Sequence, residues 1–192
     1  MRIPSPALFS SALFLILTSC GGKDDQAENT TVPDSSASSA LDSILLSEAP
    51  EGAVDITKAR QNPIPGTKVI LSGKVMGNVN PIIQSRALLT LGDPAKITSC
   101  DLIPGDDCKT PWDVCCADPD IVKASIATIQ VLGESGKPLK VGLKGIAGLR
   151  ELSNLIVVGE VAEGSDQNNF LVNATGIHVT MAQTGGDGIP KQ

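Results

Sequence analysis

The stretch Val69-Ile70-Leu71-Ser72-Gly73-Lys74-Val75 decides the fold class of this chain. Its odd-numbered residues are aliphatic or glycine and alternate with the residues of a second face, which is the period of a half-buried β-strand. Residues 155–161, Leu-Ile-Val-Val-Gly-Glu-Val, repeat the pattern aliphatic-x-aliphatic-x-Gly-x-Val. Unless this repeat is a chance one, a glycine at the same inward position of two strands indicates strongly bent strands, as a small barrel requires.

Other segments supply the remaining strands of such a barrel. Alternating apolar residues predict strands within 86–92, 123–132 and 170–179, and residues 139–143 are a candidate for a further short strand. The apolar spacing of residues 146–152 suits a short helix. The order of three strands, a short helix and two strands resembles the OB fold, a five-stranded, partly open barrel. The chain is therefore predicted to be mainly β, a small five-stranded OB-like barrel with one short helix.

A long insertion, residues 93–122, joins the second and third predicted strands and contains Cys100, Cys108, Cys115 and Cys116. A connection of this length is unusual in a compact domain unless it is functional or braced. An even, clustered set of cysteines in an exported protein favours disulfides. Closing a loop of about 15 residues stabilises a fold by roughly 3 kcal/mol. Because a bond between adjacent cysteines strains the backbone, we expect each of the last two to bond one of the first two, in either order.

Two other chemistries compete for these thiols. Four thiolates can hold zinc, but structural zinc sites usually present Cys-x2–4-Cys pairs, and neither gap in this cluster fits. A thiol-redox role normally shows Cys-x-x-Cys, which is also missing. The aspartates of the insertion lack the spacing of a calcium loop, so we interpret them as a solvated acidic loop and predict no metal site. These residues are Asp93, Asp101, Asp106, Asp107, Asp113, Asp118 and Asp120.

The most distinctive local string is Thr110-Pro111-Trp112-Asp113-Val114-Cys115-Cys116. It resembles the TPWDYCC motif of uncharacterised bacterial lipoproteins with an OB-like barrel, and the resemblance extends from about Asp55 to Val179. Val114 stands where that motif has tyrosine. The resemblance implies a fold and an envelope location, but no activity. Trp112 either plugs the mouth of the barrel or stands out as a partner anchor, so Trp112 and Asp113 are the candidate binding residues.

The N-terminus carries an export signal. Leu17-Thr18-Ser19-Cys20 ends a short apolar run that begins near Ala7. It resembles the lipobox of bacterial lipoproteins, in which the cysteine is acylated and becomes the first residue of the mature chain. The run is shorter than the ~20 residues of a membrane-spanning helix. Residues 1–19 are therefore predicted to be a signal peptide, and Cys20 the lipidation site.

Composition divides the rest of the chain. Residues 20–52 are mostly small and polar, so we predict a lipidated flexible tether with an r.m.s. span of roughly 30 Å. The apolar patch at 44–46 either docks on the domain or forms a short turn. The barrel domain is predicted for residues 53–182, and the glycine-rich residues 183–192 are predicted to be a disordered tail.

Several functions are disfavoured by the composition. His178 is the only histidine and lies on a predicted strand, which favours a satisfied strand residue over a catalytic base. No phosphate-binding loop or dinucleotide fingerprint occurs. The net charge is −6, with one tryptophan and no tyrosine. OB barrels that bind single strands use aromatic platforms in a basic groove, so nucleic acid is excluded as a partner. We expect no enzyme activity and no cofactor.

The first hypothesis is a lipid-anchored lipoprotein of the bacterial cell envelope that acts as a non-enzymatic binding module. Its disulfide-braced insertion would meet an envelope protein or a glycan. Glycine rather than aspartate at position 21 favours the periplasmic face of the outer membrane. The alternative hypothesis is a metal-handling or thiol-redox protein that uses the four clustered cysteines.

Overall fold

The computed structural model describes residues 35–180 of the chain. The predicted signal peptide, Cys20, the first part of the predicted tether and the predicted tail lie outside the described residues. Among the residues described, no helix has the length and hydrophobicity that crossing a bilayer requires.

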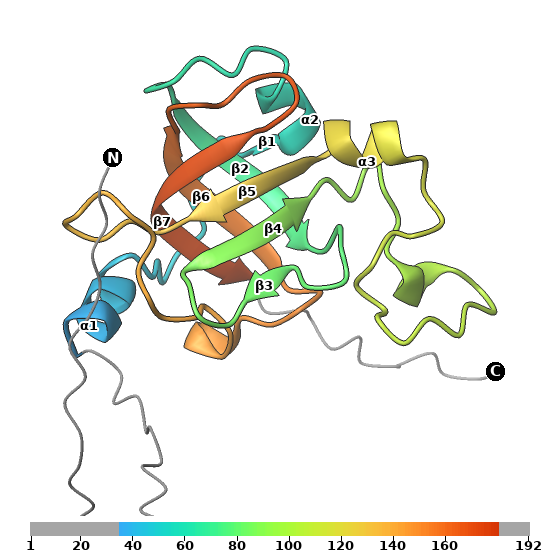
Figure 1. Ribbon diagram of the computed structural model, residues 1–192, viewed down its shortest axis with the longest axis horizontal. Helices are drawn as coiled ribbons and strands as arrows, with labels where there is room; N and C mark the ends of the chain where they lie inside the picture. The colour runs from blue at the N-terminus through green and yellow to red at the C-terminus, as the bar shows by residue number, and fades with distance from the viewer. Residues whose placement is uncertain (1–34, 181–192) are drawn as a thin grey trace, which may run out of the picture. The chain divides into compact units, whose positions relative to one another are not determined.

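Five strands form a closed barrel (Figure 1). They are β2 (Lys68–Val75), β4 (Leu88–Gly92), β5 (Ile126–Gln130), β6 (Asn154–Val161) and β7 (Leu171–Thr180). Antiparallel pairs join β2 to β4, β4 to β5, β2 to β6 and β6 to β7, and a parallel pair between β5 and β7 closes the barrel. This connectivity confirms the predicted OB-like barrel. Two short strands, β1 (Val54–Asp55) and β3 (Ile82–Ile83), extend the sheet at β2 and β4.

The two glycine-containing strands, β2 and β6, pair with each other along most of their length. A Cβ atom on Gly73 would lie 2.6 Å from Cγ of Leu91 and 2.9 Å from the carbonyl oxygen of Gly92. A Cβ atom on Gly159 would collide with the carbonyl oxygen of Asn173, beside a register shift between β6 and β7. The prediction that these glycines permit close backbone approach is therefore confirmed.

The barrel encloses one large apolar core, in which Phe170 is 1% exposed. Arg60 enters this region from α2 (Ile56–Ala59) and its C-terminal cap, and it is buried. Its guanidinium group donates hydrogen bonds of 2.8 Å to the carbonyl oxygens of Ile126 and Gln167 and lies 6.0 Å from the Phe170 ring centre. Burial lowers the pKa of Arg60, and the charge of Asp166 opposes this shift. Arg60 thus links α2 to the start of β5 and to the loop before β7.

The segment between β5 and β6 is less regular than the sequence predicts. Its helical part is a single 3-10 turn, η2 (Ile146–Gly148), in which Ala147 has a φ of 48°. Residues 139–143 form no strand. The backbone of Leu139 instead accepts a hydrogen bond from Ala87 and donates one to Val131, which attaches this segment to the barrel.

The end of the predicted tether is folded. Helix α1 (Ser35–Ser43) buries Leu41, which is 1% exposed, against the barrel core. The backbone N–H of Leu46 donates to the carbonyl of Ile177, and the N–H of Ile177 donates to that of Ile44. The prediction of a flexible tether is thus wrong for residues 35–43, which form α1, and of the two alternatives predicted for residues 44–46 the structure shows docking on the domain. The reason is physical: Leu41 and the apolar residues 44–46 can bury against β7, whereas composition reports mainly the polar residues around them.

Candidate functional site

The insertion between β4 and β5 projects from one end of the barrel (Figure 1). It contains a 3-10 turn, η1 (Cys100–Leu102), and a short helix, α3 (Pro119–Ala124). The side chain of Asp118 caps α3 by accepting hydrogen bonds from the backbone N–H groups of Asp120 and Ile121, and Pro119 occupies the first turn. This Asp-Pro pair is a helix start that is readable from sequence.

Asp93 fastens the base of the insertion. Its carboxylate is fully buried and accepts hydrogen bonds from the backbone N–H of Thr57 at 3.1 Å, the hydroxyl of Thr57 at 2.6 Å and the N–H of Ala95 at 3.0 Å. The backbone N–H of Asp93 donates to the carbonyl of Ser125 at the other end of the insertion. The side chain of Asp93 therefore ties the insertion to α2, and the backbone of Asp93 joins the two ends of the insertion.

A second, small apolar cluster lies beneath the insertion. Met76, Ile97 and Val114 are each 3% exposed or less and pack together, apart from the barrel core. Val114 occupies the position at which the resembling motif has tyrosine. A tyrosine there would have to bring its hydroxyl to a polar partner or to solvent. In this chain Val114 instead contributes an apolar side chain to the packing beneath the insertion.

Trp112 is half-buried and bonded to the loop between β2 and β3. Its indole Nε1 donates to the carbonyl oxygen of Val79 at 2.8 Å, and its own carbonyl accepts from Gly77 at 3.2 Å. Asp113 acts within the loop, where its carbonyl accepts from the N–H of Cys100 and its carboxylate accepts from the N–H of Val114. Both candidate binding residues therefore shape the insertion, and Trp112 is neither deep in the barrel nor detached from it.

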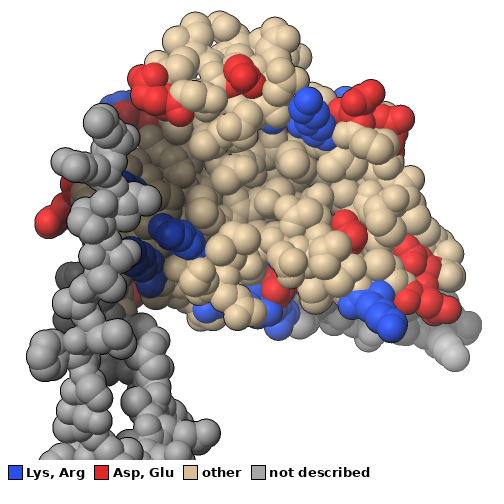
Figure 2. Space-filling model, viewed as in Figure 1, with Lys and Arg blue, Asp and Glu red and all other residues tan. Residues whose placement is uncertain are grey.

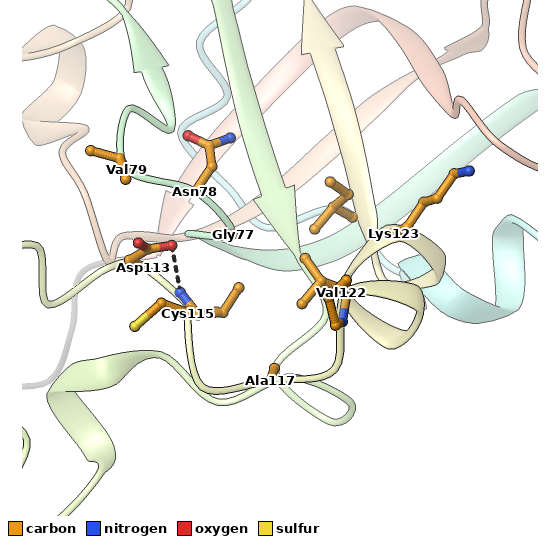
Figure 3. Close-up of a pocket in the computed structure, with 11 residues that line it drawn as sticks. Gly77, Asn78, Val79, Asp113, Cys115, Ala117, Val122 and Lys123 are labelled. Carbon is orange, nitrogen blue, oxygen red and sulfur yellow. Dashed lines mark hydrogen bonds between the residues drawn. The ribbon is translucent and has the colours of Figure 1, made fainter.

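A shallow apolar cavity of about 390 Å³ opens beside this motif. Figure 3 shows Asn78 and Val79 from the loop after β2 on one side, and Val122 and Lys123 of α3 on the other. Cys115 lies on its wall. The cavity thus adjoins the cysteine cluster, and sequence patterns gave no sign of it.

The sulfur atoms of the insertion gather in one place. The Sγ atoms of Cys100 and Cys115 are 3.7 Å apart, and those of Cys115 and Cys116 are 3.9 Å apart. The Sγ atoms of Cys100, Cys108 and Cys115 all lie within 4.8 Å of one another. These distances are contacts, since a disulfide bond is about 2.05 Å long. The clustering was predicted correctly, but the predicted disulfides are not formed in the structure, where all four thiols are free.

The thiols differ in their environment. Cys100 is 3% exposed, whereas Cys115 and Cys116 are exposed. Burial raises the pKa of Cys100, and hydrogen bonds with Cys115 and Asp106 raise it further. Hydrogen bonds with the side chain and backbone of Thr110 lower the pKa of Cys108. Cys108 is therefore a better source of thiolate than Cys100.

Two acidic residues border the thiols. The Asp106 carboxylate accepts a hydrogen bond from the N–H of Cys108 at 2.8 Å through Oδ1. Its Oδ2 is buried and has no hydrogen-bond partner within residues 35–180. Asp101 follows Cys100 in the sequence. Lys74 Nζ lies 3.4 Å from its carboxylate and donates to Ser99 Oγ at 2.9 Å, and Ser99 is also hydrogen bonded to Asp101.

The insertion is acidic, but it is not simply a solvated acidic loop. Figure 2 shows acidic side chains on the side of the molecule that carries the insertion. Asp93 is nevertheless fully buried, Asp106 has a buried oxygen, and Asp118 caps a helix. The interpretation is therefore wrong for Asp93 and for the buried oxygen of Asp106, whose carboxylates accept hydrogen bonds from backbone N–H groups, whereas Asp118 is solvent-exposed while it caps α3.

His178 takes the structural role that the sequence predicts. Its Nδ1 donates to the carbonyl oxygen of Leu46 at 3.0 Å, so the ring fastens the segment after α1 to β7. Sequence reasoning missed Asp93, Lys74 and the unpartnered oxygen of Asp106. The partners of Asp93 and Lys74 are distant in the chain, and only the Asp-x-Cys spacing at 106–108 hinted at a local turn.

Comparisons of the chain with protein-family models, with curated proteins and with solved structures give no match. The resemblance to lipoproteins with the TPWDYCC motif therefore stays a prediction.

Proposed function

We propose that this chain is a lipid-anchored lipoprotein of the bacterial cell envelope that acts as a non-enzymatic binding module. In this proposal Cys20 carries the lipid, the periplasmic face of the outer membrane is the location, and the barrel presents the insertion to an envelope protein. A glycan is the other class of partner that the proposal admits.

The observation that carries this proposal is apolar exposure around the insertion. Leu102 is 63% exposed and Ile121 51% exposed, and both belong to the insertion. Val79, whose carbonyl holds the Trp112 indole, is 52% exposed and lines the apolar cavity. Large exposed apolar side chains, one of them beside a tryptophan and an apolar cavity, are typical of protein contact surfaces.

Photo-crosslinking in intact cells tests the binding module. A benzophenone amino acid is placed at Val79 or Ile121, and at Ile64 as a matched control, because Ile64 is 53% exposed but lies outside the insertion. We expect a discrete adduct from Val79 and Ile121 that is weak or missing from Ile64, and a lower yield when Trp112→Ala is added. Equal adducts from all three positions would remove the insertion as the contact surface.

Metabolic labelling with an alkyne fatty acid tests the anchor. The wild-type chain should take up the label and sediment with membranes, whereas Cys20→Ala should take up none. Cys116→Ser is the matched control, because it removes an exposed thiol elsewhere in the chain. Label that persists in Cys20→Ala would refute the lipid anchor at Cys20. It would not bear on the binding surface of the insertion.

We propose further that the cysteines form two disulfides in an oxidising compartment. The 3.7 Å contact favours the pair Cys100 and Cys115, which leaves Cys108 for Cys116. Intact mass should then rise by about four hydrogens on reduction, and a peptide map without reductant should show these two links. A chain that is exported but keeps four alkylatable thiols would refute this brace.

The second candidate function is metal handling or thiol-redox chemistry at the same cysteines. It is favoured by one specific observation, the convergence of three sulfur atoms within 4.8 Å. A disulfide uses two sulfurs, whereas a bound cation uses three or four. Mass spectrometry of the native and the reduced chain separates a bound metal from a disulfide.

A further inference from the structure

We infer that Cys100, Cys108 and Cys115, when reduced, bind one thiophilic cation of the zinc class, beside the Asp106 carboxylate that accepts a hydrogen bond from the N–H of Cys108. This inference rests on the second candidate function. It is independent of the lipid anchor and of the binding surface.

The sulfur geometry supports a cation. A tetrahedral zinc ion with bonds of ~2.3 Å places its sulfur ligands roughly 3.8 Å apart. The Cys100 and Cys115 sulfurs are 3.7 Å apart, and the Cys108 sulfur lies within 4.8 Å of both. The three atoms thus need only a small contraction to surround one ion.

The backbone holds these ligands in place despite their wide spacing in the sequence. The N–H of Cys100 donates to Asp113 at 2.9 Å, and the N–H of Asp101 donates to Pro111 at 2.9 Å, so two segments of the insertion lie side by side. Cys108 is turned by the bond from its own N–H to Asp106. In structural zinc sites a Cys-x2–4-Cys spacing brings two ligands together, whereas in this chain backbone hydrogen bonds bring the cysteines together.

The buried oxygen of Asp106 is the second observation. Oδ2 is shielded from solvent without a hydrogen-bond partner among the described residues, which costs free energy unless something else satisfies it. A cation, or a donor group bound to it, would satisfy this oxygen.

Binding would exchange protons for metal without electron transfer. Each thiol releases its proton to solvent as its sulfur bonds the ion, so three S–H bonds break and three metal–sulfur bonds form. Cys116 is the natural control. It is adjacent to Cys115 in sequence and exposed, but its sulfur does not belong to the group of three.

The test uses the full chain, purified in detergent and reduced without oxygen, with Zn2+ alone as ligand and Co2+ as spectroscopic probe. We expect one zinc per chain in native mass spectra and a thiolate-to-cobalt charge-transfer band. Cys108→Ser should weaken zinc binding about 100-fold or more, and Asp106→Asn about 10-fold. Cys116→Ser should change the affinity little. Cys108 is chosen because it is less buried than Cys100, and circular dichroism checks that each variant is folded.

Three outcomes would overturn the inference. They are a reduced chain that takes up no zinc, a cobalt spectrum without thiolate character, and equal losses in Cys108→Ser and Cys116→Ser. If zinc fails to bind but the chain exchanges disulfides with a dithiol probe, this inference falls while the redox form of the second candidate function stands. A chain that is isolated with disulfides and binds zinc after reduction supports the inference and assigns it to the reduced state.

Discussion

The barrel and the insertion are stabilised in different ways. The barrel surrounds one continuous apolar core and closes its own hydrogen-bonded edges through the parallel pair of β5 and β7. The insertion has only a small cluster of its own, around Met76, Ile97 and Val114. It depends on buried polar contacts, above all those of Asp93.

Because of this difference, the groups that can bind or react lie in the insertion and not in the barrel core. Apolar burial is non-directional and tolerates repacking, whereas a buried carboxylate or thiol fixes geometry only with its partners in place. The barrel therefore acts as a rigid base, and the insertion is the part in which a bond, a cation or a partner can change the order of the chain. The following predictions test that division, from the largest expected effect to the smallest.

Phe170→Ala should be the most damaging change. It removes the only aromatic ring in the barrel core of the described residues and the surface beneath the Arg60 guanidinium. The expected loss is about 3–5 kcal/mol of unfolding free energy, measured by denaturant titration. Phe170→Leu should lose much less because most of the volume is kept. A loss well below about 3 kcal/mol for Phe170→Ala would show that the ring is not tightly packed.

Asp93→Ala should come next, with a loss of about 2–4 kcal/mol, because three hydrogen-bond donors lose their buried acceptor. Hydrogen exchange should rise in residues 93–125 more than in β6 and β7. Asp93→Asn keeps the shape and one acceptor oxygen, so it should be milder. If exchange rose equally over the whole chain, Asp93 would belong to the barrel and the division would be wrong.

Ile97→Ala should cost about 2 kcal/mol, at the low end of the range for such changes, since the small cluster has few neighbours. The chain should remain folded, and protection should fall in the insertion alone. Leu89→Ala, a change of similar size in the barrel core, is the matched comparison. An Ile97 variant that unfolds the barrel would contradict the independence of the two clusters.

The ion pair of Lys144 and Glu151, 2.7 Å apart, should matter least. Burial acts to raise the pKa of Glu151, but hydrogen bonds from Lys144 and from its own backbone outweigh this, and its pKa is lowered. A lowered pKa gives stability that is present above the unfolded-state pKa and lost as pH falls through the folded-state pKa. Because the Lys144 side chain is 52% exposed, Glu151→Gln should cost less than about 0.5 kcal/mol near neutral pH. The difference in unfolding free energy between the wild type and Glu151→Gln should vanish in acid. A difference that grows as the pH falls would contradict the lowered pKa of Glu151.

The barrel was readable from sequence because its signals are local. Alternation marks β2 and β6, and the matched glycines Gly73 and Gly159 mark their bend. Helix α1 was missed because composition averages Leu41 into a polar stretch. The insertion was located correctly, since its length and cysteines are visible without any knowledge of contacts.

The details of the site could not be read in the same way. Whether a charged side chain is buried depends on partners that are far along the chain. Asp93 bonds Thr57 across 36 residues, and Arg60 reaches Ile126 and Gln167 across 66 and 107. The cysteine spacing predicts proximity, but whether the sulfurs bond one another or a third atom depends on distances that spacing does not contain.

The docking of α1 and residues 44–46 onto β7 sets a limit on reach. If Cys20 is acylated, only residues 21–34 separate the lipid from the first described helix, and a fully extended segment of that length spans at most about 50 Å. The insertion then lies no farther from the bilayer than this length plus the width of the domain. A partner that stays farther away than that, for example on the opposite side of a wide periplasm, could not contact the insertion.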